Sequence, residues 1–131
     1  MRTILLITYD ISPYKGSEAS VSWNYVSKMA EHNKLITIYG KGKEDVERYL
    51  KQNQMPNVRF INIPFIPVSG SGLIMDIEYN LNYRKWHWQA YLWAEDIVER
   101  EHVDVIHYLN PIGFKEPGYC WKIKEVPYVW G

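Results

Sequence analysis

Cysteine is almost absent from this 131-residue chain, which contains Cys120 alone. A single cysteine cannot form an intrachain disulfide, and such low use is typical of a reducing compartment. No apolar run approaches the roughly 20 residues that a membrane-spanning helix needs. The short apolar run at the N-terminus meets Asp10 without a small-residue cleavage site, so it does not resemble a signal peptide. We therefore expect a cytoplasmic protein.

An excess of charge of one sign is also lacking. The chain has 15 Lys and Arg against 15 Asp and Glu, and its formal net charge is zero. Nucleic-acid-binding proteins usually carry a basic excess, so we expect no nucleic-acid partner. The four histidines are scattered and Cys120 has no partner at C-x-x-C spacing, so we expect no metal site. Cys120 itself is expected to be a buried, inert thiol.

Three motifs of well-known enzyme classes are missing. The sequence has no G-x-G-x-x-G dinucleotide fingerprint, no P-loop and no G-x-S-x-G nucleophile elbow. The first absence disfavours a nucleotide-dependent epimerase or reductase, the second a P-loop nucleotide hydrolase, and the third an α/β-hydrolase.

Apolar runs alternate with amphipathic stretches along the chain. We predict strands at residues 3–9, 34–39, 58–63, 103–108 and from 127, and helices at 18–32, 44–53, 75–100 and, more briefly, 117–123. This alternation predicts an α/β fold, a Rossmann-like open parallel sheet with helices on both faces. Residues 58–63 alternate apolar and polar side chains, which favours a strand near the sheet edge. We expect residues 1–131 to form one domain.

Aromatic residues are abundant, at 15% of the chain, with six Trp and eleven Tyr. Large aromatics are usually buried. For the helix at 75–100 we therefore expect a buried face of apolar residues, with Arg84 and Lys85 facing water. That face comprises Ile77, Leu81, Trp88, Leu92 and Trp93, with Ile97 and Val98 near its end. The alternative is that residues 80–93 rest on a membrane surface or grip a lipid-linked acceptor, which would make the protein a peripheral membrane protein.

Candidate ligand contacts lie at the carboxyl ends of the first and fourth predicted strands, because open α/β sheets bind ligands there. Gly16, Ser17 and Glu18 open the first helix, where backbone N–H groups could bind a phosphate or a sugar hydroxyl. Ser17 is a candidate N-cap, and a plain capped helix start is the alternative. His107 could act as a general base or bind a ligand hydroxyl, or it could be a structural histidine.

Three segments resemble, in matching order and spacing, the retaining family-4 glycosyltransferases. The family's Gly-Ser-Glu…Gly-Trp pattern is similar to residues 16–23, with Ser22 where Gly is common. Its D-x-x-H-x-L-T-P-x-G segment is similar to residues 104–113, with Asn110 in place of Thr and Leu109 where many relatives have a second His. Its P-G…W…P-F-V-W-G stretch is similar to residues 117–131, whereas residues 41–102 carry almost none of the resemblance.

This resemblance implies the N-terminal, acceptor-binding half of a GT-B fold. The implied reaction transfers a sugar from a nucleotide-sugar donor to a saccharide or lipid-linked acceptor in polysaccharide or glycolipid synthesis, without metal or other cofactor. It implies His107 as catalytic, and Gly16, Ser17, Glu18 and Asn110 as substrate-binding. The implied donor-binding domain would follow residue 131, so we expect a fragment that transfers no sugar alone. The alternative is a stand-alone Rossmann-like or flavodoxin-like binding module without catalysis.

Overall fold

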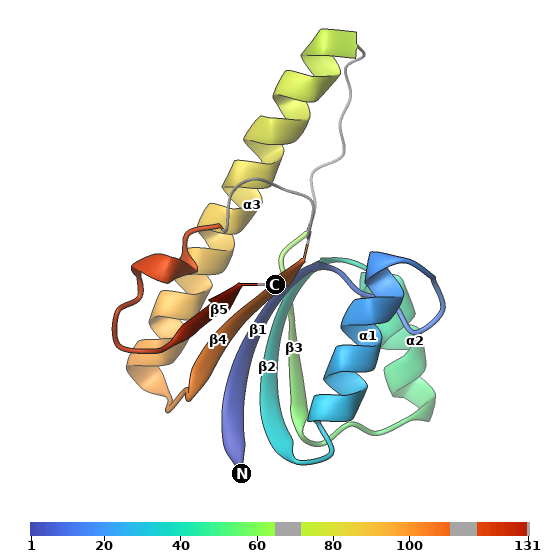
Figure 1. Cartoon of the computed structure of the whole chain (residues 1–131). Coiled ribbons are helices and arrows are strands. Elements are labelled where there is room, and N and C mark those ends of the chain that lie inside the picture. The colour runs from blue at the N-terminus through green and yellow to red at the C-terminus, as the bar shows by residue number, and fades with distance from the viewer. Residues whose placement is uncertain (65–71, 111–117, 131) are drawn as a thin grey trace.

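A computed structural model describes residues 1–64, 72–110 and 118–130, without the side chains of residues 74–76 and 110. In this part of the chain, five strands form one parallel, open sheet in the order β3-β2-β1-β4-β5 (Figure 1). The strands are β1 (Arg2–Asp10), β2 (Asn33–Lys41), β3 (Val58–Asn62), β4 (Val105–Asn110) and β5 (Tyr128–Trp130). The predicted α/β, Rossmann-like fold with helices on both faces is confirmed.

Strands β1 and β2 are buried along most of their length because helices cover both faces of the sheet centre. Residues 4–9 of β1 and 35–40 of β2 are buried without interruption, as the continuous apolar runs predict. Strand β3 lies at one edge of the sheet, as its alternating pattern predicts. Strand β4 begins two residues later than expected, because Asp104 is bonded at the bend before it: its carboxylate accepts from the Thr3 N–H at 2.8 Å.

Helices α1 (Glu18–Met29) and α2 (Lys43–Gln52) lie on the same face of the sheet (Figure 1). Trp23 and Val26 of α1 and Val46 of α2 are buried there against the strands. Ser22, which stands where the resembled family has glycine, is also buried. Its hydroxyl bonds Thr8 Oγ1 at 2.7 Å and donates to the Glu18 carbonyl at 3.0 Å, so the hydroxyl is satisfied where α1 meets β1.

Helix α3 (Gly72–Arg100) covers the opposite face, and the short 3₁₀ helix η1 (Cys120–Lys122) packs beside it. The N-terminal half of α3 projects past the carboxyl edge of the sheet (Figure 1). Its buried residues recur at helical spacing and include two alanines that let the helix approach the strands: Tyr83, Trp86, His87, Ala90, Ala94 and Ile97. The predicted short helix at 117–123 is this 3₁₀ turn, and residue 117 lies outside the described residues.

The predicted buried face of α3 is wrong, apart from Ile97 and the partly buried Val98. The other five residues assigned to it are 44–57% exposed: Ile77, Leu81, Trp88, Leu92 and Trp93. The prediction assigned the buried face from the size and hydropathy of the side chains. The face that is buried in the structure is instead the one whose polar side-chain atoms form hydrogen bonds. The buried tryptophan, tyrosine and histidine of α3 all find polar partners in the sheet or in the helix itself.

Candidate functional site

The strand order reverses direction at β1, where the chain moves outward through β2 and β3 on one side and through β4 and β5 on the other. Open α/β sheets bind ligands at such a switch point, outside the carboxyl ends of the strands. Residues 11–17, which follow β1, are described and form one wall of this edge. Residues 65–71, between β3 and α3, and residues 111–117, between β4 and η1, lie outside the described residues.

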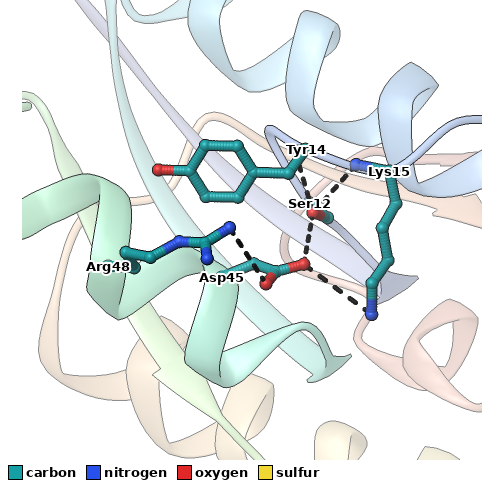
Figure 2. Close-up of polar contacts among 5 residues, drawn as sticks. All are labelled: Ser12, Tyr14, Lys15, Asp45 and Arg48. Atoms are coloured by element: carbon teal, nitrogen blue, oxygen red, sulfur yellow. Dashed lines mark hydrogen bonds and ion pairs between the residues drawn. The ribbon is translucent and has the colours of Figure 1, made fainter.

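Ser12 organises the segment between β1 and α1. Its side chain is buried, and its hydroxyl accepts from the backbone N–H groups of Tyr14 at 3.0 Å and Lys15 at 3.2 Å (Figure 2). The same hydroxyl donates to Asp45 Oδ2 at 2.7 Å. These bonds form a serine turn that fixes the loop. Sequence reasoning missed Ser12, although a serine directly before Pro13 is a known turn signal.

Asp45 joins this loop to the first turn of α2. Its carboxylate lies 3.7 Å from Lys15 Nζ and 3.9 Å from an Arg48 guanidinium nitrogen. The Arg48 guanidinium also lies over the Tyr14 ring, 4.1 Å from the ring centroid, a cation–π arrangement (Figure 2). The loop is thus held against α2 by ion pairs, a hydrogen bond and a cation–π contact.

The N-terminus of α1 carries the predicted contacts Gly16, Ser17 and Glu18. Ser17 occupies the N-cap position with φ 60° and ψ −139°, but its side chain makes no capping hydrogen bond to any described residue. An N-cap serine normally has negative φ and bonds the helix, so this exposed serine is strained. At Gly16, no described atom lies within 4 Å of the point that a Cβ would occupy, so a ligand can approach the backbone.

Charges of both signs meet at the end of β1. Burial raises the pKa of Asp10, which Glu18 and Asp45 raise further and which Lys41 and Lys15 lower. Three carboxylates and two ammonium groups therefore share this edge. Mixed donors and acceptors suit a ligand with many hydroxyl groups, each of which both donates and accepts, better than they suit a bare polyanion.

A pocket of about 440 Å³ opens beside this loop at the carboxyl ends of β2 and β3. Asn62 lines it and donates its amide hydrogens to the carbonyls of Tyr39 and Gly40, at 3.3 and 3.0 Å. Its amide group is thereby held in one orientation beside the pocket. The remaining lining residues are Lys15, Gly40, Gly42, Lys43, Glu44, Asp45 and Pro64.

His107 lies apart from this loop. It stands in the middle of β4, half-buried, and its Nδ1 is 2.7 Å from the hydroxyl of Tyr25 on α1. Tyr25 is seven residues beyond Glu18, about 10 Å along the helix axis. His107 thus contacts the middle of α1, whereas Gly16, Ser17 and Glu18 lie at its start. Asn110 ends β4, where it pairs with Thr8, and its side chain lies outside the described residues.

A second polar cluster is buried on the α3 face. His87 Nδ1 lies 3.0 Å from the Tyr83 carbonyl, which can only accept, so Nδ1 carries the proton and Nε2 accepts from the Tyr108 hydroxyl at 3.0 Å. The Tyr83 hydroxyl in turn donates to that of Tyr108. Burial lowers the pKa of His87 to about 4, so the ring is neutral. The sequence analysis did not predict this series of hydrogen bonds. The one local feature that indicates it is the four-residue spacing of Tyr83 and His87, which places both on the same face of a helix.

Three further kinds of feature were sought in the described part of the chain: a reactive thiol, a metal site and a membrane-spanning helix. Burial raises the pKa of Cys120 to about 12, which makes it the inert thiol expected. No group of three or more metal-ligating side chains occurs among residues 1–64, 72–110 and 118–130. None of the helices in those ranges combines the length and the hydropathy needed to span a bilayer.

Comparison with protein-family models, with curated proteins and with solved structures finds no match to this chain. Its functional interpretation therefore depends on the geometry above and on the three sequence motifs.

Proposed function

We propose that this chain is the acceptor-side domain of a GT-B, retaining glycosyltransferase that works in the cytoplasm. The complete enzyme would join a hydroxyl oxygen of a saccharide or lipid-linked acceptor to the anomeric carbon of the donor sugar, and the nucleoside diphosphate would leave. Three ordered motifs support this proposal, together with the parallel 3-2-1-4-5 sheet that such a domain requires.

The observation that carries the proposal is the placement of the Gly16-Ser17-Glu18 motif. It lies at the N-terminus of α1 and at the carboxyl edge of the sheet, and Ser12 and Asp45 hold the preceding loop in place. The exposed backbone at Gly16 and the exposed Ser17 hydroxyl can reach a ligand from a rigid support. The mixed charges of Asp10, Glu18 and Lys15 match a polyhydroxylated acceptor.

The proposed roles differ between the two parts of the site. Gly16, Ser17 and Glu18 would bind substrate, and the pocket beside Lys15 and Asn62 would receive the acceptor chain. His107 remains the catalytic candidate by resemblance, but its bond to Tyr25 supports a role in positioning α1 at least as well.

Amide chemical shifts of the 15.6 kDa chain would test the binding half of this proposal. We expect millimolar oligosaccharides to shift the amides of residues 15–18 and of Asn62. Asp45→Asn should weaken binding about tenfold, because it loosens the loop while leaving a similar shape. The matched control is Glu99→Gln, a carboxylate lost from the exposed end of α3.

Two outcomes would redirect the proposal. Shifts caused by nucleotides but not by saccharides would favour the stand-alone Rossmann-like binding module.

The catalytic half is tested separately, by translating the gene beyond residue 131. A second α/β domain with paired glutamates supports a glycosyltransferase, and donor-dependent product from residues 1–131 alone would contradict the expectation that this chain transfers no sugar by itself.

A further inference from the structure

Helix α3 has a second apolar face, which points away from the sheet. Ile77, Leu81, Trp88 and Leu92 follow one another at intervals of four, seven and four residues, so they form one stripe along the helix. All four side chains are exposed. We call these residues the outer stripe. The sheet covers the inner face of α3, and η1 packs against the outer stripe at Trp88. Exposed apolar surface of this kind marks an interaction site.

The 3₁₀ turn η1 extends this surface with further aromatic rings. Tyr119 packs edge-on against Trp88, with the ring centroids 5.4 Å apart, and Trp121 is exposed on the same turn. Lys122 Nζ lies 5.6 to 5.7 Å from the ring centroids of Trp88, Tyr119 and Trp121. Lys124 lies 5.6 Å from the Trp121 ring. Exposed tryptophans and lysines are thus interleaved beside the outer stripe.

The charge of this surface changes along the helix. Arg84 and Lys85 are exposed among the residues of the outer stripe, and Lys122 and Lys124 lie next to Trp88 and Trp121. The stripe ends at Leu92, beyond which Glu95 and Glu99 are exposed instead. The apolar part of the surface therefore carries four basic residues, and Glu95, Glu99 and Glu125 lie beside Lys122 where the stripe ends.

We propose that the outer stripe and the η1 turn bind an anionic membrane surface, with α3 lying in the plane of the interface. Lysines among exposed tryptophans match the interfacial layer of a bilayer, where aromatic rings sit at headgroup level and anionic lipids attract ammonium groups. Leu81 and Leu92 favour a bilayer over a saccharide, because sugars stack on rings and not on aliphatic side chains.

Vesicle co-sedimentation of the 131-residue chain tests this proposal without any sugar donor or acceptor, so its result is independent of the proposed enzyme. We expect binding to vesicles with 30 mol% phosphatidylglycerol and much weaker binding to pure phosphatidylcholine. Lys122→Glu with Lys124→Glu should weaken binding by about tenfold or more. Leu81→Ser with Leu92→Ser should weaken it similarly by removing buried apolar area, and binding should shift tryptophan emission to the blue.

The matched control is Lys28→Glu with Lys51→Glu, which changes the net charge equally on the exposed surfaces of α1 and α2. Its binding should stay within about twofold of the unaltered chain. Equal loss in the two charge variants would overturn the proposed surface, as would equal binding to neutral and anionic vesicles. Sedimentation as a lipid-independent dimer that the serine variants convert to monomer would assign the stripe to a second copy of the chain instead.

Discussion

Helices α1 and α3 cover opposite faces of one sheet with different kinds of side chain. Under α1 the contacts are mainly apolar, with Trp23 and Val26 buried and one hydroxyl pair, Thr8 and Ser22, between helix and strand. Under α3 the buried residues include Ala90, Ala94 and Ile97, but the largest ones are aromatic and hydrogen-bonded. Trp86 Nε1 donates to the Ile63 carbonyl at 2.8 Å, and His87 accepts from Tyr108.

The difference explains why α3 can present apolar residues to solvent. Its inner face is specified by polar atoms that must find partners and by two small alanines, so the attachment of α3 does not depend on its largest aliphatic residues. Those residues remain available for a second surface. Helix α1, with no comparable polar anchors apart from Ser22 and Tyr25, uses its apolar residues for the core.

The largest expected effect separates the two faces of α3. Trp86→Ala should lower the free energy of unfolding by about 3–5 kcal/mol, because it leaves a cavity and removes the hydrogen-bond donor of the Ile63 carbonyl. Trp88→Ala, two residues further along the same helix, should cost only about 1 kcal/mol, because its half-exposed ring loses mainly its contacts with Tyr119 and Lys122. Urea unfolding of both variants measures the contrast, and equal costs would show that the inner face is misassigned.

The buried histidine should make the α3 face sensitive to acid. Since burial lowers the pKa of His87 from 6.5 to about 4, the unfolded chain binds a proton that the folded chain excludes. The stabilisation is fully present above pH 6.5 and is lost as the pH falls towards 4, by about 3 kcal/mol. The difference between the unfolding free energies of the unaltered chain and of His87→Gln should therefore change by about 3 kcal/mol between pH 7 and pH 4. Parallel curves would contradict it.

Two glycine substitutions test how tightly the backbone is packed before α1 and before α2. At Gly42, with φ 108°, an added Cβ would lie 1.8 Å from the Ile11 carbonyl oxygen, so Gly42→Ala should cost about 2 kcal/mol or more. Gly16→Ala meets open space and should leave stability nearly unchanged. Thermal melting distinguishes the two. If Gly16→Ala unfolds the chain as well, the loop after β1 is packed more tightly than described.

The smallest effect concerns the strain at Ser17. Among the described residues it is the one non-glycine residue with positive φ, so Ser17→Gly should stabilise the chain by about 1 kcal/mol. Urea denaturation measures the gain. A loss of stability instead would indicate that the Ser17 side chain contributes contacts that outweigh the strain. Saccharide binding should fall in the same variant if the exposed hydroxyl contacts the ligand.

The alternation of apolar runs and amphipathic stretches was enough to predict the sheet, the order of its elements and the edge position of β3, because these follow from local periodicity and from the burial of parallel strands. The position of Gly16, Ser17 and Glu18 at the carboxyl edge followed from the same pattern. Their neighbours did not, because Ser12 meets Asp45 only when α2 folds back beside the first loop.

By itself, therefore, the sequence determined the fold class and the edge of the sheet at which the candidate site lies. Tertiary structure alone decided which face of α3 is buried. Hydropathy gives Trp86 and Trp88 the same value, but Trp86 packs against Tyr9 and donates to the Ile63 carbonyl, 23 residues away in the sequence. The tertiary structure also placed His107 beside Tyr25, 82 residues away in the sequence. Such pairings are set by how strands and helices stack, and no local pattern of residues records them.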